Sequence, residues 1–297
     1  MLDLLCIGEA MAELRRGQGE DQAPGQAGFV VGFAGDTYNT AVYAKRSLGA
    51  AGHVGFMSRV GLDPLSDGML AAAEAEGLDT SVITRDEQRN IGIYSVATDS
   101  AGERSFHYWR NHSAAKKLDA KDLVPARILY LSGITLAILS PERRRALMQA
   151  LGALKGTCEI AFDSNYRPKL WESRETAQAV IEEMWDLADL AFPSVDDEMD
   201  LFGEDSEAAV LQRFAQGNFA SCTLKRGERG PLSLTNPEPV EDFPRAQGVV
   251  DTTAAGDSFN GGFLAARLQG KSEADCLRAG HALAAYVVTK PGAIAPV

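Results

Sequence analysis

The chain has 297 residues, of which 45% are hydrophobic and 24% are charged, a composition typical of globular proteins. Its formal charge of −12 argues against nucleic acid or an anionic membrane as a partner, because the sequence lacks the Lys/Arg runs that attract a polyanion. The best apolar stretch, residues 128–139, is interrupted by Ser132, Gly133 and Thr135, so we expect no membrane span.

The amino-terminal residues and the cysteines predict a cytoplasmic protein. Residues 1–6 carry no basic segment, and the chain reaches Gly8 too soon for a signal peptide. The four cysteines form no C-x-x-C pair, so we expect them to be reduced and free of metal.

The first 33 residues predict one buried strand and two short strands that project from the body. Residues 2–9 are an apolar run typical of a central strand, and its last residue, Glu9, either has a structural role, which we favour, or faces a site. Residues 11–15 and 29–33 are strand-like, and the Gly-rich segment between them is typical of a turn or loop.

Residues 33–42 lead into a predicted amphipathic helix that ends at about Leu48, with Gly49 as its stop. Asp36 and Asn39 are three positions apart, so both can face one ligand from the first turn of this helix. The alternative is that Asp36 only caps the helix.

Residues 91–98 and 103–110 predict a hairpin around a Gly-containing turn. Along these strands Tyr94, Phe106, Tyr108 and Arg110 alternate with other residues, and a period of two places Tyr108 and Arg110 on one face. An aromatic-rich sheet with a solvated arginine is the alternative interpretation. Together with the strands near residues 11–33, this hairpin can form a small sheet that closes over a substrate.

The middle of the chain alternates strands with helices, and polar segments follow several strands. These segments are residues 163–167, 194–198 and 225–230. In doubly wound sheets, ligands gather at the carboxyl ends of the strands. Each segment also has an alternative explanation. Residues 163–167 can hold an exposed arginine in a loop, and the acids of residues 194–198 can simply favour a helix amino terminus. The G-x-x-G of residues 225–230 can be a hairpin turn.

Residues 249–263 combine a strand end, a turn of small residues and a helix start. The first N–H groups of a helix have no internal partner, so the amides of Ala255, Gly256 and Asp257 can bind a phosphoryl group. Asp257 can then accept the proton of an attacking hydroxyl, whereas the alternative is that Asp251 and Asp257 only cap the helix. We expect Ala254, as a residue with a Cβ, to have φ below zero.

Strands that alternate with helices predict an α/β fold with a mainly parallel central sheet and helices on both faces. A Rossmann fold is the competing interpretation, but no G-x-G-x-x-G follows the first strand.

Several motifs in order resemble those of the PfkB, or ribokinase-like, carbohydrate kinases. Residues 251–257 resemble the family's D-T-x-G-A-G-D, with Ala254 in place of its first Gly, and residues 34–39 resemble its G-G-D/N-x-x-N, with Ala34 in place of the first Gly. Residues 163–167 are similar to D-x-N-x-R, and residues 225–230 to K/T-x-G-x-x-G. Residues 108–110 with 113–115 are similar to the Y-W-R…S-A-A segment of the 2-keto-3-deoxygluconate kinases in that family.

The resemblance implies a ribokinase-like fold over residues 1–297 as one domain, with a β-sheet lid from segments near 11–33 and 91–112. It implies a catalytic group with Asp257 as the base beside Ala254, Ala255 and Gly256. The implied sugar site comprises Gly35, Asp36, Asn39, Tyr94, Tyr108, Arg110, Ile134, Arg167 and Asp257. The implied nucleotide site comprises Ser194, Lys225, Gly227, Gly230, Ala255, Gly256 and His281. Asp197 or Glu198 would position Mg²⁺ through water.

The implied reaction is ATP-dependent phosphorylation of 2-keto-3-deoxygluconate to its 6-phosphate, with Mg²⁺ as cofactor. A planar guanidinium at Arg110 or Arg167 suits a carboxylate, which a neutral sugar would not require. The resemblance also allows a monovalent cation such as K⁺ near Asp251 and Ala293, and a homo-oligomer formed through the lid. The alternatives are a kinase of a neutral sugar such as fructose or ribose, and a sensor of sugar or nucleotide without catalytic activity.

Overall fold

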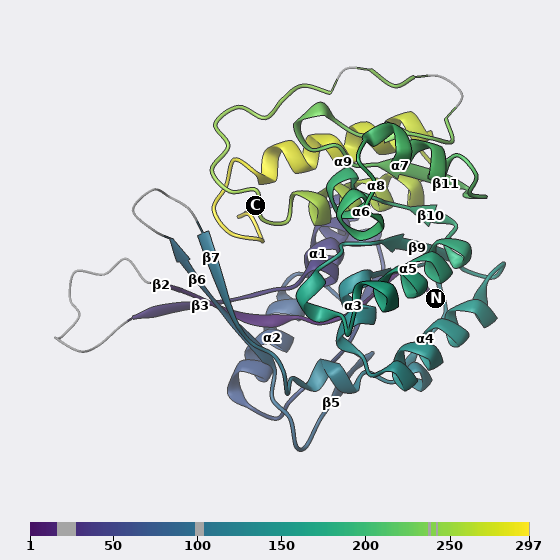
Figure 1. Ribbon diagram of the computed structural model, residues 1–297. Helices are drawn as coiled ribbons and strands as arrows, with labels where there is room; N and C mark the ends of the chain where they lie inside the picture. The colour runs from purple at the N-terminus through teal and green to yellow at the C-terminus, as the bar shows by residue number, and fades with distance from the viewer. Residues whose placement is uncertain (17–27, 99–103, 237–238, 242, 297) are drawn as a thin grey trace.

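A mainly parallel sheet runs through the main body of the protein, for which the computed structural model describes residues 1–16, 28–98, 104–236, 239–241 and 243–296 (Figure 1). Within these residues the sheet has eight strands in the order β12-β11-β10-β9-β8-β1-β4-β5, and only β12 is antiparallel to its neighbour. The strands are β1 (Leu2–Ile7), β4 (Val54–Val60), β5 (Ile83–Arg85), β8 (Ala126–Ser132), β9 (Glu159–Asp163), β10 (Leu190–Ala191), β11 (Ser221–Leu224) and β12 (Leu232–Ser233).

Helices cover both faces of this sheet, which confirms the predicted fold class. One face carries α1 (Asp36–Leu48), α2 (Pro64–Ala75), α8 (Ala255–Leu268) and α9 (Glu273–Val287). The other carries α3 (Gly133–Ile138), α4 (Pro141–Leu154), α5 (Arg174–Leu187), α6 (Val195–Phe202) and α7 (Glu207–Phe214). Short 3₁₀ turns lie at Gly49–Ala51, Ala114–Lys117, Ala120–Asp122, Pro168–Leu170 and Gly227–Arg229.

The strand residues alternate between two hydrophobic cores, one under each helical layer. On β1, Leu4 and Cys6 belong to the core with α1, whereas Leu5 and Ile7 belong to the core with α4 and α5. A strand that is buried on both faces needs an apolar residue at every position, which explains the uninterrupted apolar runs in the sequence. Burial of each large aliphatic side chain contributes about 1.5–3 kcal/mol to stability.

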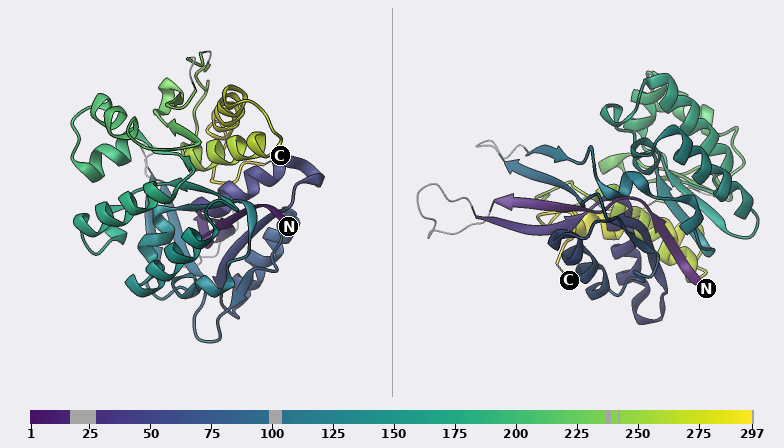
Figure 2. Two further views of the ribbon diagram at one scale, coloured as in Figure 1. Left: turned by 90° about the vertical axis from the view of Figure 1, so that its right-hand side faces the viewer. Right: turned by 90° about the horizontal axis from the view of Figure 1, so that it is seen from below.

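A second sheet projects from one side of the body, as the right-hand view of Figure 2 shows. Its strands are β2 (Met11–Arg16), β3 (Phe29–Ala34), β6 (Gly92–Thr98) and β7 (Arg104–Trp109), in the order β3-β2-β6-β7. The pairs β2/β3 and β6/β7 are antiparallel, whereas β2/β6 is parallel. The turns predicted between these strands fall mostly on residues 17–27 and 99–103, which lie outside the described residues.

Helices α1 and α8 differ from the other α-helices in how their amino ends are capped. In the described part of the chain, every other α-helix begins at a Ser or Asp whose side chain accepts a hydrogen bond from a backbone N–H of the first turn. Gly35 precedes α1 and Ala254 precedes α8, and neither has a side-chain cap. The first turns of α1 and α8 therefore begin without the side-chain cap that the other helices have.

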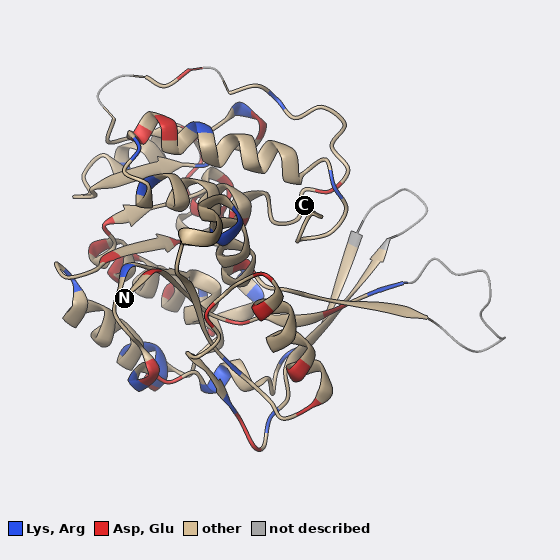
Figure 3. Ribbon diagram, turned by 180° about the vertical axis from the view of Figure 1, so that it is seen from behind, with Lys and Arg blue, Asp and Glu red and all other residues tan. Residues whose placement is uncertain are grey.

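Charged residues of both signs are interspersed along the ribbon (Figure 3). No helix within the described residues is both long enough and apolar enough to cross a membrane.

Candidate active site

Two adjoining cavities lie at the carboxyl edge of the main sheet. The first, of about 610 Å³, is bounded by the ends of the strands, the inner face of the second sheet and the first turn of α8. The second, of about 530 Å³, lies between the segment around residues 225–231, the segment around residues 245–252 and helices α8 and α9. Both cavities are lined by Lys225, Gly227, Thr252, Ala255 and Gly256, which therefore mark their junction.

Most of the site residues predicted from the sequence line these cavities. The first cavity contains Gly35, Asp36, Asn39, Tyr94, Tyr108, Arg110, Ile134, Arg167, Ser194, Asp197, Lys225, Gly227, Ala254, Ala255, Gly256 and Asp257. The second contains Lys225, Gly227, Ala255, Gly256 and His281. Gly230 and Glu198 line neither cavity.

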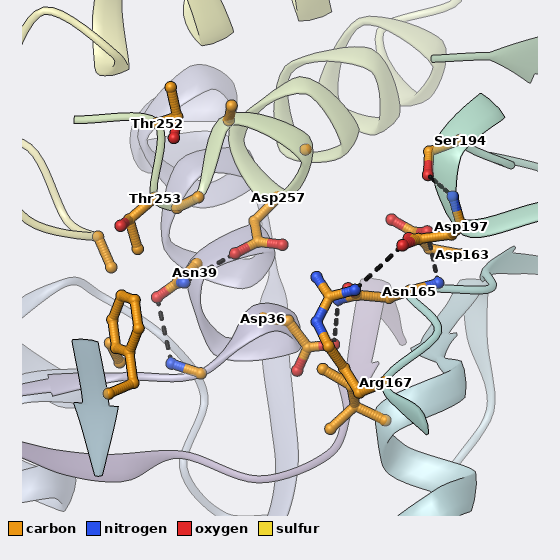
Figure 4. Close-up of a pocket in the computed structure, with 18 of the residues that line it drawn as sticks. Asp36, Asn39, Asp163, Asn165, Arg167, Ser194, Asp197, Thr252, Thr253 and Asp257 are labelled. Atoms are coloured by element: carbon orange, nitrogen blue, oxygen red, sulfur yellow. Dashed lines mark hydrogen bonds and ion pairs between the residues drawn. The ribbon is translucent and has the colours of Figure 1, made fainter. Parts of the chain in front are cut away.

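Asp257 projects from the first turn of α8 into the first cavity (Figure 4). Nδ2 of Asn39 donates a hydrogen bond to its Oδ2 at 2.8 Å, and Oγ1 of Thr40 donates to its backbone oxygen at 3.2 Å. Burial, together with the negative charge of Asp36, raises the pKa of Asp257 to about 7. A carboxylate with this pKa is suited to accept a proton near neutral pH.

The turn before α8 differs from the expectation for Ala254. This residue is in the left-handed region with φ 60° and ψ 17°, whereas we expected φ below zero. The turn requires this conformation although a Cβ makes it unfavourable, and such strain is typical of functional sites.

The backbone N–H groups at the start of α8 form a smaller donor set than we predicted. The N–H of Ala255 already donates to the carbonyl of Thr252 at 3.2 Å. The N–H groups of Gly256 and Asp257 have no acceptor among the described residues. These two amides, at the positive end of the helix dipole, are therefore the ones available to an anion.

The interpretation of Asp251 and Asp257 as helix caps is wrong, because α8 has no side-chain cap. Asp251 accepts hydrogen bonds from the N–H groups of Thr253 at 3.0 Å and Gly292 at 2.6 Å, so it fixes the two loops that flank the cavity.

At the start of α1, Gly35 is required because an added Cβ would collide with the carbonyl oxygen of Glu9. Asp36 is not the cap of this helix either. Its Oδ2 accepts hydrogen bonds from Oγ of Ser132 and, at 3.0 Å, from Nδ2 of Asn165. Burial raises the pKa of Asp36. The hydroxyl, the amide and the carboxylate form a polar surface suited to hydroxyl groups of a ligand.

The second sheet contributes an aromatic wall and one cation. Tyr94 and Tyr108 are paired across β6 and β7, with ring centroids 5.7 Å apart. Arg110 follows β7 and forms an ion pair with the carboxylate of Glu9. Glu9, for which we favoured a structural role, is buried and lines the same cavity. The sequence placed Glu9 at a strand end but did not indicate its partner 101 positions away.

The acids after β10 separate into one that faces the cavity and one that does not. Asp197 lines the first cavity, and its Oδ1 lies 3.1 Å from Nη1 of Arg167. Burial raises the pKa of Asp197. Glu198 is fully buried against Arg213, with an ion-pair distance of 2.9 Å, and burial raises its pKa to about 7. Of the two acids, only Asp197 can reach a metal ion that is bound in the first cavity together with a ligand.

The first cavity is also lined by two polar residues that the sequence analysis did not assign to the site. Asp163 is the last residue of β9 and Asn165 follows that strand, and both line the first cavity together with Arg167, which we had selected from the same segment. Their position at the carboxyl end of a buried strand was the available signal. Two side chains that donate to Asp163, those of Lys225 and Asn260, lie far along the chain and left no such signal.

The second cavity is mostly apolar, as a site for a planar ring requires. Phe259, Ala284 and Val288 line it together with His281. The imidazole of His281 lies 5.1 Å from the ring of Phe243, and its Nε2 lies 2.8 Å from the carbonyl oxygen of Pro244.

Gly230 does not line the second cavity. Its N–H donates to the carbonyl oxygen of Gly227 at 3.1 Å, and its φ of 76° favours glycine. The structure therefore gives Gly230 a role in the turn rather than in the lining of the cavity.

The donor set can accommodate a metal ion only together with a ligand. Among the described residues no group of three or more His, Cys, Asp or Glu side chains could hold a metal by itself. Mg²⁺ retains several waters and is commonly bound by one or two carboxylates plus phosphates. Asp197, on the wall of the first cavity, fits that mode.

The comparisons with known proteins agree with this arrangement. The whole chain, residues 1–297, matches the pfkB family carbohydrate kinase model. The chain is 40% identical over 307 aligned residues to the 2-dehydro-3-deoxygluconokinase of Escherichia coli (strain K12), with 99% of this chain and 97% of that protein covered. It is 38% identical to the 2-dehydro-3-deoxygluconokinase of Dickeya dadantii (strain 3937), with the same 99% and 97% covered.

The fold has solved counterparts as well. An uncharacterized sugar kinase from Pyrococcus horikoshii, crystallised in complex with ATP, matches with a TM-score of 0.80 and 26% identity, covering 98% of this chain and 93% of that chain. The chain therefore belongs to the pfkB family of carbohydrate kinases.

Proposed function

We propose that this protein transfers the γ-phosphoryl group of ATP to the 6-hydroxyl of 2-dehydro-3-deoxygluconate, which is also called 2-keto-3-deoxygluconate. The observation that carries the proposal is the position of Asp257. Its carboxylate, with a pKa raised to about 7, lies beside the two available amides and close to the junction of the cavities. The names of the two bacterial relatives support this choice of substrate.

Each cavity has the chemistry of one substrate. The first is polar and has Asp36, Asn39, Tyr108 and Arg110 on its walls, which suits a hydroxylated acid. The second is apolar and suits the base of a nucleotide. In this arrangement the phosphates of ATP extend from the second cavity to the first.

The reaction is a direct transfer at the junction. The substrate hydroxyl oxygen attacks the γ-phosphorus, and the bond from that phosphorus to the β,γ-bridging oxygen breaks. The hydroxyl proton passes to the carboxylate of Asp257, and ADP leaves. The N–H groups of Gly256 and Asp257 stabilise the negative charge on the transferring group. Mg²⁺ would neutralise charge on the phosphates, with Asp197 as the carboxylate that holds it through water.

Two arginines select the acid in this proposal. Arg110 and Arg167 line the first cavity, and each is paired with a carboxylate of the protein, Glu9 and Asp197 respectively. A substrate carboxylate can share or replace these pairings, because a guanidinium offers five donors in a planar fork.

Assembly and location are part of the same proposal. We treat residues 1–297 as one domain whose second sheet is the lid of the substrate site. We infer a cytoplasmic enzyme that forms a homo-oligomer through the outer face of the lid, and we assign it no nucleic-acid or membrane partner.

We assign no step to a monovalent cation. Asp251 accepts hydrogen bonds from the N–H groups of Thr253 and Gly292, and the carbonyl oxygen of Ala293 accepts one from the hydroxyl of Tyr43 at 2.8 Å. The test compares the rate of ADP release in K⁺ salts with the rate in tetramethylammonium salts. A K⁺ site near Asp251 and Ala293 would make the rate in K⁺ salts much higher.

The test is an ADP-release assay over sugar acids and neutral sugars, followed by ³¹P NMR of the product. We expect the highest kcat/KM with 2-dehydro-3-deoxygluconate and a phosphomonoester at its C6. A preference for fructose or ribose would replace this assignment by a neutral-sugar kinase. Ligand-induced shifts in Tm without ADP release would make the protein a sensor.

A further inference from the structure

Lys225 occupies a central position between the two cavities. It follows β11 and lines both cavities, and its side chain is mostly buried. A Cβ added to Gly256 would lie 3.5 Å from its Nζ, so the ammonium lies next to one of the two amides available to a phosphoryl group. A cation at this point can stabilise a phosphoryl group during transfer.

The ammonium of Lys225 is held by the carboxylate of Asp163. Oδ2 of Asp163 accepts hydrogen bonds from Nζ of Lys225 and, at 2.7 Å, from Nδ2 of Asn260. Its Oδ1 accepts from the N–H of Asn165 at 3.1 Å. Asp163 is only 2% exposed, so these contacts fix a carboxylate that has little access to water.

The same contacts connect Lys225 to the proposed base. Asn260 lies three residues after Asp257 on α8, and its Nδ2 is also 2.9 Å from the hydroxyl of the buried Tyr130. Helix α8 therefore carries both Asp257 and the residue that orients Asp163. This arrangement fixes the distance between the base and the ammonium.

We propose that Asp163 is a positioning residue that holds the ammonium of Lys225 at the junction of the two cavities, where it stabilises the phosphoryl group during transfer. A lysine side chain is flexible, and without a fixed partner its charge would be distributed over several rotamers. Asp163 itself does not touch the reacting atoms in this proposal. The inference rests on the proposed kinase reaction. It goes beyond that reaction because it gives Asp163 a role in positioning Lys225.

The experiment is a double-mutant cycle with Asp163→Asn and Lys225→Met, measured as kcat and as KM for both substrates. We expect Asp163→Asn to lower kcat by about 10–100-fold, the size of loss that a misplaced group causes, with KM for the sugar acid changed by less than about threefold. In the Lys225→Met background, Asp163→Asn should cause no further loss, because its effect passes through Lys225. Lys225→Arg, which retains the charge, should recover part of the lost kcat.

Two controls separate positioning from structural damage. Asp189→Asn also removes a carboxylate that accepts a backbone hydrogen bond, from Ile160 at 2.9 Å, but Asp189 lines neither cavity, so kcat should stay unchanged. Asn260→Ser is the substitute test if Asp163→Asn fails to fold. It removes the amide that donates to Asp163, so it should also lower kcat, but by less than Asp163→Asn.

Independent losses that multiply in the double variant would overturn the proposal. A rise in the Mg²⁺ concentration for half-maximal rate in Asp163→Asn would overturn it too, because Asp163 would then act on the metal. Both results require an active wild-type enzyme. A wild-type protein that releases no ADP with any sugar or sugar acid would instead refute the proposed function.

Discussion

Asp257 shows at the scale of one residue how burial and charge raise the pKa of a carboxyl group into the range that the proposed base requires. A solvated aspartate has a pKa near 3.8, whereas burial and the nearby charge of Asp36 raise this one to about 7. Asn39 orients its carboxylate, and the charge of Lys225 opposes the shift. The residue can therefore lose its proton near neutral pH and still be basic enough to take one from an alcohol.

The pH dependence of the rate follows from this pKa. A carboxyl group with a pKa of about 7 is increasingly protonated as the pH falls below that value, and the protonated form cannot act as a base. We expect kcat/KM to rise with pH up to about 7 and then to level off, in a profile measured from pH 5 to 9 with saturating Mg²⁺. A rate independent of pH across this range would contradict the assignment of the base.

Arg110 should distinguish acids from neutral sugars. The variant Arg110→Ala should raise KM for 2-dehydro-3-deoxygluconate by at least about tenfold, since a charged hydrogen bond contributes about 1.5–3 kcal/mol, and should alter KM for fructose much less. The control is the double variant Arg110→Ala with Glu9→Gln. It removes the buried Glu9 carboxylate, which Arg110→Ala alone would leave without its partner. Equal changes for both substrates would refute carboxylate recognition by Arg110.

At the scale of the element, the start of α8 combines the two amides of the proposed anion site with a strained turn. Apart from α1, the other α-helices within the described residues follow a Ser or Asp cap, whereas α8 follows Ala254, which is in the left-handed region. The N–H groups of Gly256 and Asp257 find no acceptor in the part of the chain that the structure describes. In the proposed function, this helix start serves to bind an anion rather than to maximise stability.

The strain at Ala254 predicts a stabilising substitution. Glycine adopts φ near 60° without the steric cost of a Cβ, so Ala254→Gly should raise the free energy of unfolding by about 1 kcal/mol in urea denaturation. Ala266→Gly in the interior of α8 is the matched control and should lower it by about 1 kcal/mol or more. A lowered stability of Ala254→Gly would show that the turn carries no strain.

The sequence was sufficient for the layers of the fold and for most positions of the candidate site. Alternating apolar runs, glycine stops and small-residue turns are local features, and they predicted the strands, the helices and the turn before α8. Contacts between distant residues have no local pattern: Glu9 meets Arg110, and Asp163 meets Lys225. The left-handed Ala254 was also missed, because a residue type shows which conformation is easy and not which conformation the turn imposes.

At the scale of the whole molecule, the site is divided between two sheets. In the proposed function, the main sheet and α8 supply the base, the amides and the acids, whereas the second sheet supplies Tyr94 and Tyr108. A wall that belongs to a projecting sheet can close over a substrate and exclude water, which strengthens the electrostatic contacts inside.

The outer face of the projecting sheet predicts self-association. Phe29, Val31 and Trp109 lie on the face away from the cavity, and they are 51%, 44% and 62% exposed. Such a patch favours burial against a second copy. We expect Val31→Asp to shift the protein to a monomer in sedimentation velocity, while Leu62→Asp, at an exposed site outside the two sheets, leaves the mass unchanged. A wild-type monomer at all concentrations would contradict association through the lid.

The most direct measurement is the kcat of Asp257→Asn with ATP and 2-dehydro-3-deoxygluconate, together with the dissociation constants of both substrates. Asparagine retains the shape and the contact with Asn39 but cannot accept the hydroxyl proton. The account predicts that kcat falls by about 10³-fold or more, while each dissociation constant stays within about threefold. A variant that turns over at the wild-type rate would show that Asp257 is not the base.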